Sequence, residues 1–379
     1  MAASPAGREG PYRTLLVDDS QAVRRIVRRL VERSETGRVV AEAGDGAEAA
    51  RIIAERARSS EPVEVVFLDI EMPGTDGLTA LERMRSVQPM PKVIMLSALT
   101  RRGATVTLRA LARGAADYIC KPAAGTAPEF ENELQNKLRL WGAAFRRERQ
   151  RSAGLRGDPW PAAGAGSRTR GAGVPHSPSA TSTAPPGGLA ALAIGSSTGG
   201  PQAVMQLLGG LRGAMGFPVF LVQHMPPGFT RAFAEQIAQT LGIEAVEAEE
   251  GMPARQGCVH VAPGDYHLRA VREGGEVRLR LDRSPPLHFC RPAVDALLDS
   301  LAPLYGRHLW TVILTGMGQD GLEGCRKVVE QGGTVLAQDE ESSVVWGMPG
   351  AVVRARLARF VGTPEMLARR LREARRMAA

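Results

Sequence analysis

The chain has 379 residues, 44% of them hydrophobic, and a formal net charge of +8. This length suits two domains better than one. No apolar stretch approaches the roughly 18 residues of a membrane span, and residues 1–10 lack the apolar core of a secretory signal. We therefore expect a cytoplasmic protein without membrane insertion.

The basic residues and the cysteines point to no further site. A basic surface attracts phosphate, but the arginines are spread over several predicted helices without a recognition-helix motif. We interpret them as a solvated surface and expect no nucleic-acid partner. The cysteines form no CxxC pair, which argues against a disulfide framework or a zinc site: Cys120, Cys258, Cys290 and Cys325.

Residues 11–150 alternate short apolar runs with helical patterns, which is typical of an α/β domain, and residues 1–10 before them are expected to be disordered. The runs, interpreted as buried strands, are Tyr12 to Val17, Val63 to Leu68, Val93 to Leu96 and Ala116 to Cys120. Ser20 can cap a helix after the first run. The expected apolar face of that helix consists of Val23, Ile26, Val27 and Leu30.

Polar residues close each of these runs. They are, in order, Asp18 with Asp19, then Asp69, Ser97 and Lys121. Right-handed crossovers bring the ends of parallel strands to one rim, so we expect these side chains to converge. Three close carboxylates need a compensating cation, and an all-oxygen cluster suits Mg²⁺. Taken singly, the paired acids could cap a helix and Ser97 could be a plain loop hydroxyl.

Together these motifs resemble a response-regulator receiver domain. The resemblance rests on the paired acids, on the run LDIEMPGTDG from Leu68 to Gly77, and on the pairs Ser97-Ala98 and Lys121-Pro122. It implies a (βα)5 fold in which a histidine kinase phosphorylates Asp69. It also implies that Mg²⁺ is held by Asp18, Asp19, Asp69 and the backbone carbonyl of Glu71. The residues implied to respond to the phosphoryl group are Ser97, Tyr118 and Lys121.

Residues 151–188 are dominated by Gly, Ala, Pro, Ser and Thr. Such a stretch cannot bury enough apolar surface to offset the entropy lost on ordering. We predict a flexible linker, followed by a second domain over residues 189–379.

Three apolar runs of the second domain lead to a serine, a histidine and an aspartate. Leu189 to Gly195 precedes Ser197, Pro218 to Val222 precedes His224, and Trp310 to Leu314 precedes Asp320. We predict a doubly wound, mostly parallel sheet whose strand ends bring the three residues into one crevice. A Ser-His-Asp set there indicates a serine hydrolase. Each residue also has an alternative interpretation when it is taken alone. The GxSxG turn from Gly195 to Gly199 could cradle phosphate, His224 could be structural, and Asp320 could cap the helix from Gly321 onward.

The surrounding motifs resemble the CheB family of chemotaxis protein-glutamate methylesterases. They are IGSSTGGP at 194–201, QHMPPGFT at 223–230, VAPGD at 261–265, RPAVD at 291–295 and ILTGMG at 313–318. Gln319 departs from a more usual Asn. The resemblance implies a carboxylic ester hydrolase that releases methanol from glutamate methyl esters on chemoreceptors and deamidates receptor glutamines.

In that resemblance Ser197 is the nucleophile, His224 the base and Asp320 the residue that orients the histidine. Backbone groups of Thr198 and Met317 lie around the oxyanion. The esterase reaction needs no cofactor, and phosphorylation of the receiver domain relieves inhibition of the hydrolase.

Two alternatives remain. One is a serine esterase of the same fold that acts on another substrate in a two-component pathway unrelated to motility. The other is a response regulator with a DNA-binding output, which would need a helix-turn-helix motif where the sequence shows strands and a Ser-His-Asp set.

Overall fold

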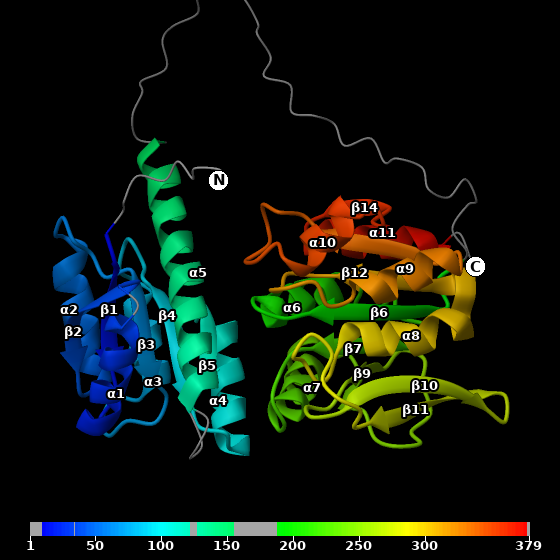
Figure 1. Ribbon diagram of the computed structural model, residues 1–379, viewed down its shortest axis with the longest axis horizontal. Helices are drawn as coiled ribbons and strands as arrows, with labels where there is room; N and C mark the ends of the chain where they lie inside the picture. The colour runs from blue at the N-terminus through cyan, green and yellow to red at the C-terminus, as the bar shows by residue number, and fades with distance from the viewer. Residues whose placement is uncertain (1–9, 34, 122–126, 155–187, 377–379) are drawn as a thin grey trace, which may run out of the picture. The chain divides into compact units, whose positions relative to one another are not determined.

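The computed structural model describes residues 10–33, 35–121, 127–154 and 188–376. We treat residues 10–154 as the N-terminal segment and residues 188–376 as the C-terminal segment, and describe each by itself (Figure 1). Most of the predicted linker and of residues 1–10 lies outside the described residues, and helix α5 continues through Gly154. In the described ranges, no helix has both the length and the apolar character to cross a bilayer.

The N-terminal segment contains a five-stranded sheet in the order β2-β1-β3-β4-β5. The strands are β1 (Tyr12–Val17), β2 (Gly37–Ala43), β3 (Val65–Asp69), β4 (Lys92–Ser97) and β5 (Asp117–Cys120). Neighbours β1–β2, β1–β3 and β3–β4 pair in parallel, which confirms the predicted fold class. The strand β2 was not predicted, because it is an edge strand whose side chains are only partly buried and form no continuous apolar run.

Four helices connect these strands and a fifth follows β5. They are α1 (Gln21–Glu32), α2 (Gly46–Ala57), α3 (Gly77–Met84), α4 (Arg101–Ala112) and α5 (Ala127–Gly154). The hydroxyl of Ser20 accepts the Val23 N–H at 3.4 Å and caps α1 as predicted. Helix α1 buries Val27 and Val31, whereas Ile26 is 54% exposed. The prediction for Ile26 was wrong. Ile26 directly precedes the buried Val27, and successive side chains of a helix point about 100° apart around its axis, so Ile26 lies outside the buried face.

The C-terminal segment contains a seven-stranded sheet in the order β14-β13-β12-β6-β7-β9-β8. The strands are β6 (Ala191–Ser196), β7 (Val219–Gln223), β8 (Ala245–Glu247), β9 (Val259–Val261), β12 (Leu309–Ile313), β13 (Thr334–Gln338) and β14 (Phe360–Gly362). The three predicted strands are β6, β7 and β12; β6 lies between the other two and pairs with both in parallel. An antiparallel hairpin, β10 (His267–Glu273) with β11 (Glu276–Asp282), forms a separate two-stranded sheet.

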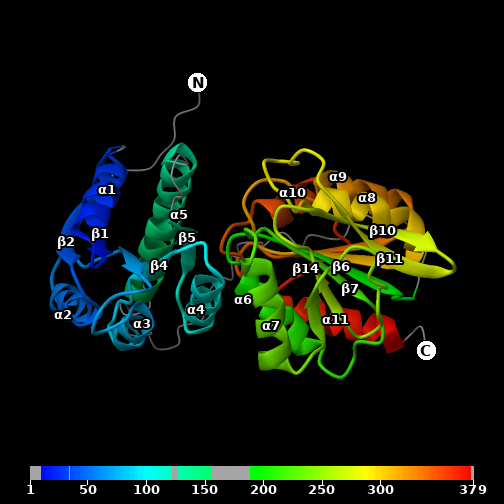
Figure 2. The ribbon, with the colours of Figure 1, turned by 90° about the horizontal axis from the view of Figure 1, so that it is seen from below.

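Helices cover both faces of this sheet, as expected for a doubly wound fold. They are α6 (Gly200–Gly210), α7 (Phe229–Leu241), α8 (Val294–Tyr305), α9 (Leu322–Glu330), α10 (Met348–Arg354) and α11 (Pro364–Arg376). Figure 2 shows α8, α9 and α10 on one face and α6, α7 and α11 on the other. The ends of β6, β7 and β12 therefore meet at one rim.

The turn after β3 leaves no room for a side chain at Gly77, where a Cβ would lie 2.1 Å from the carbonyl oxygen of Asp69. We expect Gly77→Ala to destabilise the N-terminal segment by about 1–3 kcal/mol, because backbone must move. Hydrogen exchange of the β3 amides in the full chain would measure this loss. Gly44→Ala is the matched control, since nothing lies within 4 Å of its added Cβ. Equal exchange in both variants would contradict the prediction.

Candidate functional site

The predicted serine and histidine lie at the ends of adjacent strands. Ser196 at the end of β6 pairs with Gln223 at the end of β7. The His224 N–H donates to the carbonyl oxygen of Ser196 at 3.1 Å, which fixes the histidine beside the strand that carries Ser197. The structure also brings in the third residue, because His224 Nε2 lies 2.7 Å from Asp320 Oδ2.

Gln223 joins the two strand ends and was missed by the sequence analysis. Its Oε1 accepts the Ser196 hydroxyl at 2.7 Å, and its Nε2 donates to the carbonyls of Ser197 at 2.9 Å and His224 at 3.3 Å. A Cβ at Gly200 would lie 2.0 Å from this Oε1, so only glycine fits there. The signal in the sequence was a polar residue that directly follows an apolar strand pattern.

The backbone turns sharply around Ser197. Its N–H donates to the Thr315 carbonyl at 3.0 Å, and Gly199 adopts a left-handed φ of 75°. A Cβ at Gly316 would lie 2.8 Å from the Cβ of Ser197, so the loop after β12 passes directly against the serine. Among the described residues no hydrogen bond joins Ser197 Oγ to the His224 ring. Such bonds often form only when substrate is bound.

Asp320 is held by the N-terminus of α8. Its Oδ2 accepts the Val294 N–H at 2.7 Å and its Oδ1 accepts the Asp295 N–H at 3.0 Å. The alternative that Asp320 caps the helix after Gly321 is therefore wrong, since the N-cap of α9 is Gly321 and both Asp320 oxygens accept from α8 instead. Although burial alone would raise it, the bonds from His224 and from these two N–H groups hold the pKa of Asp320 below its usual range.

A second buried carboxylate, Asp295, completes a reciprocal arrangement of two helix starts. Asp295 lies in the first turn of α8, and its Oδ1 accepts the Gly324 N–H of α9 at 2.7 Å. Its Oδ2 accepts from His288 Nε2 at 2.9 Å. Asp320, just before α9, thus caps α8, while Asp295 in α8 caps α9.

The same contacts set the proton affinity of the histidine. Burial of the His224 ring favours its neutral form, but the Asp320 carboxylate and the Cys290 side chain outweigh burial and raise the pKa of His224. With Nε2 bonded to Asp320, Nδ1 is the nitrogen left to accept a proton from Ser197. The arrangement can therefore deprotonate a hydroxyl and stabilise the resulting imidazolium.

The N-terminal segment brings together the predicted acidic residues. Carboxylate oxygens of Asp18, Asp19 and Asp69 lie within 4.8 Å of one another. Lys121 Nζ lies 2.9 Å from Asp18 Oδ2 and 2.8 Å from Asp69 Oδ1. Burial raises the pKa of Asp69, although Lys121 opposes the shift. Three carboxylates and one ammonium leave negative charge uncompensated, so this all-oxygen cluster fits Mg²⁺.

Ser97 and Tyr118 are buried beside other partners. Ser97 Oγ lies 2.8 Å from the hydroxyl of Thr107 and donates to the Ala98 carbonyl at 3.2 Å. The ammonium group of Lys137 lies over the ring of Tyr118, at 5.0 Å from the ring centroid. Pro122 and the residues up to 126 lie outside the described residues.

The chain is similar to known proteins over nearly its whole length. Residues 192–371 match the family model of the CheB methylesterase, and residues 14–128 match that of the response regulator receiver domain. The protein-glutamate methylesterase/protein-glutamine glutaminase of group 2 operon from Rhodospirillum centenum is 43% identical, covering 94% of this chain and 92% of that protein. Protein-glutamate methylesterase/protein-glutamine glutaminase 1 from Paramagnetospirillum magneticum is 45% identical, covering 93% of each. The crystal structure of the Thermotoga maritima CheB methylesterase catalytic domain has 41% identity and a TM-score of 0.48, covering 49% of this chain and 98% of that one.

The contact between His224 and Asp320 predicts a shift in the pH dependence of hydrolysis. The base works only when neutral, so activity is lost as pH falls through the pKa of His224. Because Asp320 raises that pKa, Asp320→Asn should move the acidic limb of the kcat/KM profile to lower pH. It should also lower kcat by about 10⁴-fold through misorientation of the ring.

The matched control is Asp299→Asn, which removes a carboxylate of α8 that pairs with Lys327 instead. An acidic limb at the same pH in Asp320→Asn and in the wild type would contradict the assigned contact.

Proposed function

The chain belongs to the CheB methylesterase family, and we propose that Ser197, His224 and Asp320 form the catalytic triad of its ester hydrolysis. The protein is a protein-glutamate methylesterase and protein-glutamine glutaminase with a receiver domain in front of the catalytic domain. The observation that carries the assignment is the 2.7 Å contact between His224 and Asp320 at the strand end beside Ser197. We assign residues 11–150 to the receiver domain and residues 189–379 to the catalytic domain.

The triad acts in two steps. Ser197 Oγ attacks the ester carbonyl while His224 Nδ1 takes its proton, and His224 then delivers that proton to the departing methanol. Water attacks the acyl-enzyme with the same histidine as base, which releases the glutamate carboxylate and restores the Ser197 hydroxyl. Asp320 keeps the ring oriented and stabilises its charged form in both steps.

Two backbone N–H groups are available for the oxyanion. Among the described residues, neither Thr198 N–H nor Met317 N–H donates to a protein acceptor. Thr198 directly follows the nucleophile, and Met317 follows Gly316, which lies against Ser197. Donors that are left unpaired beside a nucleophile suit a developing negative charge. The same acyl-enzyme forms from a glutamine side chain, with ammonia as the leaving group.

The receiver domain supplies control through phosphotransfer. Asp69 would accept the phosphoryl group from a histidine kinase, and Mg²⁺ would be held by Asp18, Asp19, Asp69 and the backbone carbonyl of Glu71. When bound, the ion offsets the charge of the carboxylates and the phosphoryl oxygens. Lys121 already contacts Asp69 and can pair with the phosphoryl group.

Movement of two buried residues would transmit the signal. Ser97 would leave Thr107 to bond the phosphoryl group, and Tyr118 would respond by changing its packing. Phosphorylation would thereby relieve inhibition of the hydrolase. The substrate would be the cytoplasmic domain of methyl-accepting chemoreceptors, which places the enzyme in the cytoplasm.

Methanol release from methylated receptor tests the assignment of the nucleophile. We expect Ser197→Ala to lose several orders of magnitude of activity and to keep about 10³-fold acceleration over water from the oxyanion donors. A small fluorophosphonate should label Ser197 in the wild type and leave the variant unlabelled.

Equal methanol release from wild type and Ser197→Ala would refute the proposed nucleophile. A wild type that is labelled but releases no methanol from receptor would instead support an esterase of the same fold with another substrate.

Stimulation by phosphorylation tests the role of the receiver domain. A small phosphodonor with Mg²⁺ should speed methanol release by the wild type, whereas Asp69→Asn should keep the unstimulated rate and lose the stimulation. Chelation of Mg²⁺ should also abolish the stimulation of the wild type. Glu61→Gln, which neutralises an exposed carboxylate paired with Arg38, is the control and should respond like the wild type. Stimulation of Asp69→Asn would exclude Asp69 as the phosphoacceptor.

A further inference from the structure

A strained two-residue turn lies next to the catalytic histidine. Leu287 and Cys290 exchange backbone hydrogen bonds of 3.1 and 2.8 Å, with His288 and Phe289 at the tip. Both tip residues adopt left-handed backbone angles, with φ of 51° and 62°. Turns of this type normally use Asn and Gly. Non-glycine residues in this conformation persist only where surrounding structure holds them, and they cluster at functional sites.

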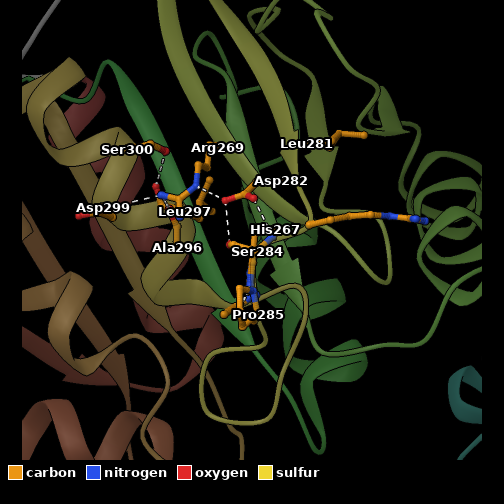
Figure 3. Close-up of polar contacts among 12 residues, drawn as sticks. His267, Arg269, Leu281, Asp282, Ser284, Pro285, Ala296, Leu297, Asp299 and Ser300 are labelled. Carbon is orange, nitrogen blue, oxygen red and sulfur yellow. Dashed lines mark hydrogen bonds and ion pairs between the residues drawn. The ribbon is translucent and has the colours of Figure 1, made fainter.

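The base of the loop that carries this turn is held from both ends. His267 is fully buried, and its Nε2 lies 3.2 Å from the Pro285 carbonyl while its Nδ1 accepts the Ala293 N–H at 3.2 Å. Figure 3 shows this histidine beside Pro285, with Ser284 bonded to Asp282 at the end of β11. The loop from residue 285 to 293 is therefore anchored to the hairpin and to the start of α8.

Arg291 fixes the same loop from its other side. Its guanidinium donates to the carbonyls of Arg283 and Ser284, both at 3.1 Å, and pairs with Asp265 at 2.6 Å. These bonds cross the loop rather than run along it. They restrict the backbone on either side of the turn, so the tip is presented in one conformation.

The neighbours of Phe289 lie near the catalytic groups, since a ring nitrogen of His288 is within 4.8 Å of a carboxylate oxygen of Asp320. His288 bonds Asp295, whose N–H in turn holds Asp320. The Cys290 side chain helps to raise the pKa of the His224 ring. The Phe289 side chain, in contrast, is fully exposed to solvent, at 102%. The turn thus pairs His288 with Asp295 and leaves the aromatic ring of Phe289 in solvent near the active site.

A second exposed apolar side chain lies by the nucleophile. Met317 is 45% exposed, and it follows Gly316, whose backbone lies against Ser197. Exposed apolar side chains are therefore carried by two separate loops, one with His288 near Asp320 and one with Gly316 against Ser197. Exposed apolar groups that rigid loops hold beside a reactive centre are typical of recognition surfaces.

We propose that Phe289 is a substrate-contacting residue that packs against an apolar side chain of the protein substrate beside the glutamyl ester. The inference rests on the proposed function, since it names how the protein substrate is recognised at that same site. A ring held rigidly before binding loses little conformational entropy on contact, so its apolar area contributes to affinity. Phe289 thereby favours an ester carried by a protein surface over an isolated ester.

Phe289→Asn tests the proposal without disturbing the turn, because asparagine tolerates the left-handed conformation. In the full-length enzyme, kcat/KM for methanol release from methylated receptor fragment should fall about tenfold, mainly through KM. The rate of Ser197 labelling by a small fluorophosphonate should stay at the wild-type value. Phe289→Tyr should restore turnover because it keeps the ring. Met366→Asn, in α11 and 44% exposed, is the matched control and should leave both readouts unchanged.

The two readouts separate the possible failures. Wild-type turnover by Phe289→Asn would overturn the proposal, because the ring would then contribute nothing to recognition. Equal losses in turnover and labelling would also overturn it, since Phe289 would then act through the triad. A wild type that is labelled at Ser197 but releases no methanol from receptor would refute the proposed function itself.

Discussion

The catalytic site depends on where one buried carboxylate obtains its hydrogen bonds. Removing the charge of Asp320 from water costs free energy unless donors replace the lost solvent. The start of α8 supplies two N–H groups and the positive end of the helix dipole, and His224 supplies a third donor. Helix α8 must therefore begin at Val294. That requirement fixes Ala293, the residue through which His267 holds the end of the 285–293 loop. The position of the histidine, the first turns of two helices and the loop beside the active site all follow from this one anchored charge.

The sequence predicted the strands whose ends carry the chemistry, because each was a continuous apolar run followed by a polar residue. It did not predict β8, β9 and β14, which have three residues each and so form no such run. Asp320 was identified as a catalytic residue, but its N–H partners could not be predicted, because Val294 and Asp295 lie far earlier in the chain. Local spacing offered only a cap for its own helix as the alternative to the catalytic role. The roles of Gln223 and Asp295 were not predicted for a similar reason. They arise from contacts between elements that only the folded sheet brings together.

Two parallel sheets with different strand orders carry different electrostatic arrangements at their rims. At the rim of the N-terminal sheet, three carboxylates face a single ammonium, so the site carries excess negative charge that suits a cation and then a phosphoryl group. At the other rim, two buried carboxylates, Asp320 and Asp295, each accept from a helix start and an imidazole, and the chemistry needs only the movement of a proton. The fold determines where polar residues converge in both cases. The number and sign of the charges brought there decide which reaction the rim can support.

The triad alone cannot distinguish a glutamyl ester on a protein from a small free ester, because both present the same carbonyl to Ser197. Selectivity must come from groups outside the reacting atoms, and the rigid packing around Ser197 limits which groups are available. Gly200 and Gly316 bring backbone and Gln223 so close that little side-chain surface is left beneath the nucleophile. The exposed surface beside it comes from loops, and the 285–293 loop is held by His267 at its base and by Asp295 at its tip. A strained turn held in this way makes structural sense if its outward residue meets the substrate, since rigidity reduces the entropy lost when that contact forms.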